Sequence, residues 1–257
     1  MTSGTHIESR RTERRARRAA LALTAAALAT ALAACQSDDS ASPASGPGPG
    51  AATAGAPASA APAGPPLQPA DYVLVAGPAT ASYTQQNNTD TTESTVFEEP
   101  VPTCMHLSAA ELGPASTDHA NGPVFETDEG LSINSGARVF ATADTVSTHR
   151  ALVARPDFPG CVGQAIVGQF SNRDQEASHS TVRSAVAATP PAGATALTRL
   201  DLTLAMDSQT VNVHVDLVSI FSGRVESVIL IINPFTALPD SEVNAMTSQV
   251  AATLAKQ

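Results

Sequence analysis

Histidines and carboxylates are the side chains of this sequence best suited to chemistry, and His214 with Asp216 is their clearest pairing. The two residues are two positions apart in an alternating stretch, so a strand would place both side chains on one face. A histidine beside a carboxylate can transfer protons or bind a metal, and Asp201 or Glu226 could pair with His214 from a neighbouring strand. The simpler interpretation is a solvated face of a sheet, and we favour it.

Motifs for catalysis are absent from the sequence. It contains no Gly-x-Ser-x-Gly, no P-loop, no Gly-x-Gly-x-x-Gly and no His-Glu-x-x-His. Asp128, Glu129 and Gly130 are too short a fragment to count as a calcium loop. We therefore predict no catalytic residue, no metal site and no cofactor, and we expect that the protein is not an enzyme. The other histidines of the mature chain lie in different predicted elements without ligand spacing: His106, His119, His149 and His179.

The N-terminus has the features of an exported, lipidated protein. Six arginines before residue 19 precede an uncharged run of 16 residues from Ala19 to Ala34, which suits a signal peptide better than a membrane span. The run ends in Leu32, Ala33, Ala34 and Cys35, which resembles the lipobox of bacterial lipoproteins. We predict that residues 1–34 are a signal peptide and that Cys35 carries acyl chains such as palmitate. Acyl chains contribute about 0.8 kcal/mol per buried methylene, so they can hold the protein at the outer face of the cell membrane.

The other two cysteines form an even pair once Cys35 is assigned to lipid. In an oxidising compartment we expect Cys104 and Cys161 to form a disulfide. The two are 57 positions apart, and closing such a loop is worth roughly 4 kcal/mol in the chain-entropy description. A redox-active pair is a weaker interpretation, because there is no Cys-x-x-Cys spacing and no basic neighbourhood.

Composition divides the mature chain into a tether and a domain. Residues 35–66 follow the signal as an Ala, Pro, Gly and Ser segment, which cannot bury enough apolar surface to fold. Residues 67–257 have the length of one domain. Eight basic and 22 acidic residues follow residue 18, giving a formal charge of −14. This charge argues against nucleic acid as a partner and against docking on an anionic membrane through a basic face.

The stretch from Arg199 to Ile232 predicts three antiparallel strands joined by tight turns, with Gly223 at the second turn. A final helix from Asp240 carries Val243, Met246, Val250 and Leu254 on one face and would cover this meander. The other predicted elements are short strands at Tyr72 to Ala76 and Thr80 to Thr84, a polar loop from Gln85 to Thr95, helical turns within His106 to Leu112, a hairpin over Pro123 to Phe140, a helix from Thr142 or Asp144 to about Arg155, a helical piece from Pro159 to Phe170, and a strand over Thr181 to Ala188.

Taken together, these features resemble actinobacterial cell-envelope lipoproteins and the extracellular sensor domain of PknH-type mycobacterial serine/threonine kinases. The phrase Val211 to Leu217, which leads into Ser222, Gly223, Arg224 and Val225, is the most specific part of the resemblance, which covers residues 67–257. It implies an α+β fold with a twisted antiparallel sheet that ends in the three-strand meander. Two main helices cover this sheet, and one disulfide cross-links the domain. It also implies a cleft for an extracellular ligand. The sequence has one cysteine pair where the kinase sensor has two.

Our leading hypothesis is a membrane-anchored, non-catalytic domain that binds a small molecule, a glycolipid or an envelope protein. A carrier of lipid or glycolipid, or an envelope assembly factor, is the first alternative, and a large apolar cavity would favour it. A hydrolase of envelope polymers is the second alternative, and a cleft with two close carboxylates, or an acid paired with His214, would favour it.

Overall fold

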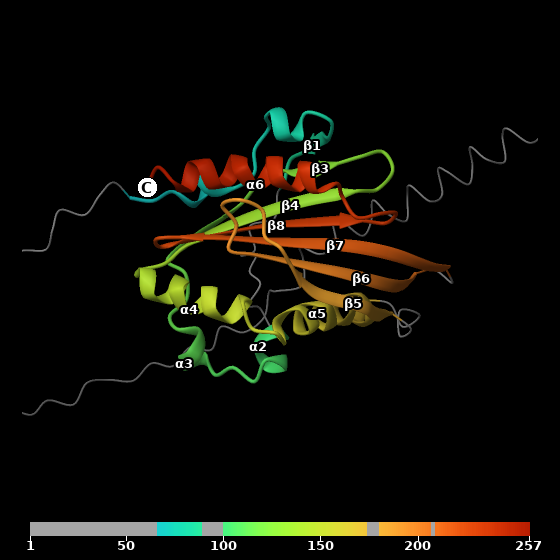
Figure 1. Ribbon diagram of the computed structural model, residues 1–257, viewed down its shortest axis with the longest axis horizontal. Coiled ribbons are helices and arrows are strands. Elements are labelled where there is room, and N and C mark those ends of the chain that lie inside the picture. The colour runs from blue at the N-terminus through green and yellow to red at the C-terminus, as the bar shows by residue number, and fades with distance from the viewer. Residues whose placement is uncertain (1–65, 89–99, 174–179, 207–208) are drawn as a thin grey trace, which may run out of the picture.

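An antiparallel sheet of eight strands runs through the structure, with helices packed on both of its faces (Figure 1). The structure is a computed structural model that describes residues 66–88, 100–173, 180–206 and 209–257. Its strands are β1 (Thr84–Gln86), β2 (Asp118–Asn121), β3 (Val124–Glu126), β4 (Ser132–Val139), β5 (Thr181–Ala188), β6 (Ala196–Met206), β7 (Gln209–Ser222) and β8 (Val225–Asn233).

Within the described residues, five α-helices and two short 3-10 helices accompany the sheet. The helices are η1 (Pro69–Tyr72), η2 (Pro78–Thr80), α2 (Val101–Cys104), α3 (Ala109–Leu112), α4 (Ala143–Val153), α5 (Phe158–Arg173) and α6 (Asp240–Leu254). None of the helices in the described ranges has the length and apolar content that a membrane span needs.

The predicted meander is confirmed as β6, β7 and β8. The strand order is β1-β3-β4-β8-β7-β6-β5, and β2 pairs with β4 beside this path. Gly223 occupies the β7–β8 turn at a φ of 53°, the left-handed region that glycine enters without strain. The hairpin of β3 and β4, the strand β5 and the helices α4 and α6 also form where the sequence predicts them. The fold is therefore the expected α+β arrangement.

Both faces of the sheet are buried over most of its length, whereas the sequence pattern indicated one buried face. Helix α6 covers one face, where Val218 and Ile220 of β7 join its apolar stripe. Helices α4 and α5 cover the other face, where Val213 and Val215 of β7 are buried. Asp216, expected on a solvated face, is only 5% exposed, because it lies beside the edge of the α6 core. Three main helices, rather than two, cover the sheet.

The predicted strands at Tyr72 to Ala76 and Thr80 to Thr84 are wrong. The apolar segment 72–76 begins at the last residue of η1 and does not join the sheet. Tyr72, Val73 and Leu74 pack into the core under α6, whereas the other two side chains of the segment are exposed. Side chains provide hydrogen-bond partners for its backbone instead. The Ser227 hydroxyl donates to the Tyr72 carbonyl at 2.7 Å, and the Leu74 amide donates to the Ser135 hydroxyl oxygen at 3.0 Å. A short apolar run does not distinguish a strand from a buried irregular segment. The strand that follows begins only at Thr84.

The predicted disulfide between Cys104 and Cys161 is present, with the two Cα atoms 5.6 Å apart. It joins the end of α2 to the first turn of α5. Helix α2 and strand β2 were not predicted from the sequence. Both are four residues long, which is too short to show a hydrophobic period.

A buried ion network ties helix α4 to the sheet. The Glu226 carboxylate is 1% exposed and accepts from Arg138 Nη2 at 2.5 Å and from His149 Nδ1. His149 Nε2 contacts the Leu112 carbonyl at 2.8 Å. The network therefore places the Glu226 side chain between the Arg138 guanidinium and the His149 imidazole.

Replacing Glu226 by Gln should destabilise the protein strongly, because the buried guanidinium of Arg138 would lose the carboxylate with which it is paired. We expect a loss of about 3 kcal/mol or more in the free energy of unfolding, measured by urea denaturation. The exposed Glu129→Gln is the matched control and should stay within about 0.5 kcal/mol of the original protein. Equal effects of the two substitutions would contradict the assignment.

Candidate functional site

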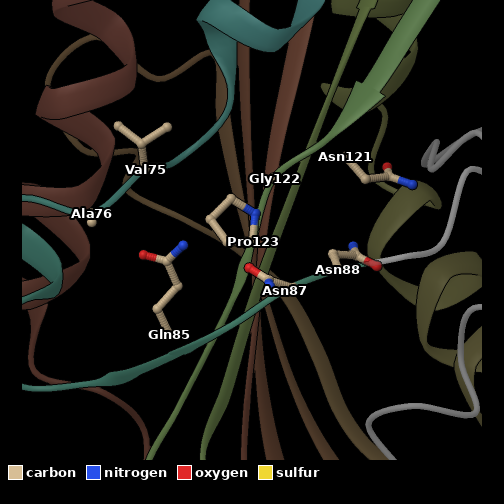
Figure 2. Close-up of a pocket in the computed structure, with 8 residues that line it drawn as sticks. All are labelled: Val75, Ala76, Gln85, Asn87, Asn88, Asn121, Gly122 and Pro123. Carbon is tan, nitrogen blue, oxygen red and sulfur yellow. The ribbon is translucent and has the colours of Figure 1, made fainter.

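A surface pocket of about 540 Å³ lies where segment 72–76, the start of the sheet and the β2–β3 connection meet. Figure 2 shows Val75 and Ala76 on one side of the pocket and Gln85 of β1 reaching toward them from the other. The volume is within the range of pockets that hold small molecules. The lining residues are Val75, Ala76, Gln85, Asn87, Asn88, Asn121, Gly122 and Pro123.

Among the described residues that line this pocket, every polar side chain is a carboxamide and none is ionisable. Each carboxamide offers an N–H₂ donor and a carbonyl acceptor at the same place. A charged ligand would lose hydration here without gaining a counter-charge, which is unfavourable. A hydroxyl group both donates and accepts, so it matches a carboxamide well. The lining therefore favours an uncharged ligand with several hydroxyl groups.

Gly122 lets two segments that are distant in sequence approach closely at this pocket. A Cβ atom on Gly122 would lie 2.4 Å from Ser135 Oγ and 3.0 Å from the Leu74 carbonyl oxygen. The Gly122 amide donates to the Ser135 carbonyl at 2.8 Å, which holds the end of β2 against β4. The polar stretch around Asn87 was predicted only as a loop, because its neighbours across the pocket depend on the tertiary fold. Residues 89–95 of that predicted loop lie outside the described residues.

His214 and Asp201 form the ion pair that the sequence allowed, with His214 Nδ1 2.5 Å from Asp201 Oδ1. The alternative partner, Glu226, is on the other face of the sheet, because it pairs in register with Phe221. Ser184, Asp201, His214 and Asn233 form one row across β5, β6, β7 and β8. Catalytic triads need the histidine between the serine and the acid, whereas this row places the acid between them. The row cannot activate Ser184 through His214.

The neighbouring row contains a second polar cluster that links the sheet to the start of α6. Arg199 donates through Nε to Asp216 at 3.2 Å and through Nη2 to Asp240. The second oxygen of Asp216, Oδ2, is buried and has no hydrogen-bond partner within the described structure. Burial raises the pKa of Asp216 above its ordinary value of 3.8, and the charge of Arg199 opposes this shift only in part.

The other residues singled out in the sequence are dispersed. His106 is in the turn after α2, His119 is on β2, and His149 belongs to the buried network with Glu226. His179 and Cys35 lie outside the described residues. Across the described ranges, no three or more His, Cys, Asp or Glu side chains are grouped so that they could hold a metal ion. Sequence reasoning did not identify the pocket residues, and the density of Asn and Gln after Thr84 was its only local signal.

No protein-family model and no curated protein sequence matches the chain. Among solved structures, the extracellular domain of PknH from Mycobacterium tuberculosis is similar, with 11% identity and a TM-score of 0.33 over 62% of this chain and 76% of that one. LpqN, involved in cell envelope biogenesis of Mycobacterium tuberculosis, is similar with 15% identity and a TM-score of 0.28 over 56% of this chain and 79% of that one. PknH is thus a structural neighbour, as the sequence resemblance implied. Scores of this size carry no argument about function, which depends on the residues of this chain.

The raised pKa of Asp216 predicts an unusual pH dependence for one carboxylate. The folded state binds the Asp216 proton more tightly than the unfolded state, so the stability that Asp216 contributes is present below pH 3.8 and is lost as the pH rises through the raised pKa. Asp216→Asn removes this titration. We expect the free energy of unfolding of the variant, relative to the original protein, to increase from about pH 4 to about pH 7 in urea titrations. A relative decrease over that range would show that the ion pair with Arg199 outweighs burial.

Proposed function

We propose that this protein is a lipid-anchored binding protein on the outer face of the cell membrane, and that its domain binds an uncharged, hydroxyl-rich small molecule such as a saccharide. The observation that carries the proposal is the pocket in Figure 2, where the four polar side chains among the described lining residues are all carboxamides. Glycolipid headgroups belong to the same chemical class. The proposed activity is binding without catalysis.

The apolar contacts of the pocket also suit a saccharide. Val75 is 46% exposed beside the amides, and Pro123 adds a second apolar surface. The C–H faces of a sugar ring can pack on such groups while its hydroxyls bond to Gln85 and Asn87. Most ligand sites combine apolar surface with a few polar groups in this way.

A carrier of acyl chains is less well supported by the described residues. Its cavity would be lined by large apolar side chains between sheet and helix, but both layers there are packed with buried side chains. The pocket that the described residues form is open and polar. A glycolipid remains compatible with it through the headgroup alone.

A specific observation favours the hydrolase alternative, namely the ion pair between His214 and Asp201. The order of residues in that row argues against nucleophilic catalysis, since Ser184 neighbours Asp201 rather than His214. Both members of the pair are partly exposed on strands. We therefore keep binding as the proposed function.

The lipid anchor is proposed from the sequence around Cys35. The lipobox motif and the tether over residues 35–66 would leave the domain outside the membrane, free to meet a ligand of the envelope.

Neutral saccharides should bind in the pocket and their charged counterparts should not. We would titrate neutral mono- and disaccharides, and the matching sugar phosphates and uronic acids, into the isotopically labelled domain and follow the side-chain amide resonances by NMR. Gln85→Leu and Asn87→Leu should each weaken binding of a neutral sugar about fivefold, because each removes a hydrogen bond worth about 1 kcal/mol. The control is Gln86→Leu on the same strand, which is exposed and does not line the pocket. Equal binding of neutral and charged sugars would overturn the proposed ligand class.

Cys35→Ser should release the protein from the membrane. Without the thiol no acyl chain can be attached, so the protein should be found away from the membrane fraction, and the mass of a diacyl or triacyl group should be missing from the intact protein. Cys104→Ser is the control, since it breaks the disulfide but leaves the acylation site. An original protein that begins elsewhere than Cys35 and carries no lipid would rule out the anchor.

A further inference from the structure

Helix α6 bonds to one wall of the pocket and to the segment that leads into the opposite wall, in both cases through a polar side chain. Gln249 donates through Nε2 to the Val75 carbonyl at 2.9 Å, and Val75 is part of one wall. Glu242 accepts a hydrogen bond from the hydroxyl of Tyr83, two residues before Gln85 in the other wall. Neither Gln249 nor Glu242 lines the pocket itself.

Helix geometry places these two residues on one side of α6. They are seven positions apart, which is close to two full turns, so their side chains leave the helix in nearly the same direction. Four residues of the same helix, Val243, Met246, Val250 and Leu254, are buried against the sheet and fix its position. The helix is thus a rigid support from which two side chains reach two separate segments.

The wall that contains Val75 depends on side chains because it has no strand neighbour. Apart from Gln249, the Val75 carbonyl accepts only from the Thr80 hydroxyl, at 3.3 Å, among the described contacts. Gln249 makes this contact although its Oε1 atom is buried and has no hydrogen-bond partner in the described structure. Such an unsatisfied oxygen costs stability. We therefore assign the role of Gln249 to its Nε2 group, which donates to the Val75 carbonyl.

The wall that begins at Tyr83 is held by a strong hydrogen bond. Burial raises the pKa of Tyr83 far above its ordinary value, and the hydrogen bond to Glu242 and the charge of Glu242 raise it further. Hydrogen bonds with an ionised acceptor are about twice as strong as neutral ones. The start of β1 is therefore attached to the same helix as segment 72–76.

We propose that Gln249 and Glu242 are positioning residues that set the separation between the two walls of the pocket and so determine which ligands fit between Val75 and Gln85. As far as ligands are concerned, this inference rests on the proposed function. A pocket that is already ordered binds its ligand without the entropic cost of arranging the walls. Loss of either contact would widen the pocket and weaken binding without changing any residue that touches the ligand.

The first experiment measures the walls in the ligand-free protein. Gln249→Leu should increase hydrogen exchange of the backbone amides in segment 72–76 about tenfold, while exchange in β6 and β7 stays unchanged. The matched control is Asn244→Leu, the same change of an amide side chain on the exposed side of α6. Equal exchange rates in the two variants would overturn the role of Gln249.

The second experiment uses the absorbance of tyrosine, because the chain has only two tyrosines and no tryptophan. Glu242→Gln should bring the pKa of Tyr83 down toward its ordinary value in an alkaline titration, while Tyr72 keeps the raised pKa that its own burial causes. An unchanged titration curve would overturn the role of Glu242. This readout would not move if Glu242 acted only through the general stability of α6.

Binding then separates the two proposals. If the original domain binds a neutral sugar, Gln249→Leu should weaken that binding at least fivefold and Asn244→Leu should leave it unchanged. Faster exchange with unchanged affinity would overturn the positioning role and leave the proposed function intact. If the original domain binds no neutral sugar, the proposed function fails, and the exchange and titration results still decide whether α6 positions the walls.

Discussion

The buried carboxylate of Glu226 is the interaction on which the arrangement of sheet and helices depends. It accepts hydrogen bonds from Arg138 of β4 and His149 of α4, and His149 in turn reaches the Leu112 carbonyl at the end of α3. Arg138 also stacks over Phe140, with its Cζ 5.1 Å from the ring centroid, and the same ring meets His149 edge-on. Burial of this carboxyl group is tolerated because it pairs with the Arg138 guanidinium and bonds to the His149 imidazole. The register of β4 against β8 and the position of α4 are thus determined together.

The two sides of the sheet are organised differently. On the α4 and α5 side, apolar side chains and the disulfide between Cys104 and Cys161 make a conventional core. On the α6 side, segment 72–76 lies in the core without joining the sheet, and its backbone is bonded to Ser227, Ser135 and Gln249. Because segment 72–76 is held by side chains and does not pair with a strand, it does not extend the sheet. The amide-lined pocket forms between this segment and the sheet.

The part of the sheet near the start of α6 carries polar interactions, and the described residues there form no recognisable catalytic arrangement. Asp201 pairs with His214, and Arg199 joins Asp216 to Asp240 in the first turn of α6. These contacts tie the start of α6 to β6 and β7, whereas Glu242 and Gln249 tie the same helix to the pocket walls. Helix α6 therefore connects this polar part of the sheet with the proposed ligand site.

Much of the fold could be predicted from local pattern alone. Period-two alternation identified β6 and β7, strands were also predicted where β5 and β8 form, and the spacing of Val243, Met246, Val250 and Leu254 identified α6. Cysteine parity identified the disulfide, and the lipobox around Cys35 remains a prediction of the sequence. The predictions of these strands, of α6 and of the disulfide are confirmed because each depends on residues close in sequence or on a simple count.

Other features were decided by tertiary structure. The apolar segment 72–76 is suited to a strand, yet its neighbours are side chains from β4, β8 and α6 rather than a strand edge. Glu226 bonds to Arg138 and His149 rather than His214, because strand register places it on the opposite face. The pocket joins residues near positions 75, 87 and 122, whose common feature is proximity in space. Local periodicity determines which face of an element is apolar, whereas pairing and register determine which residues from distant segments meet.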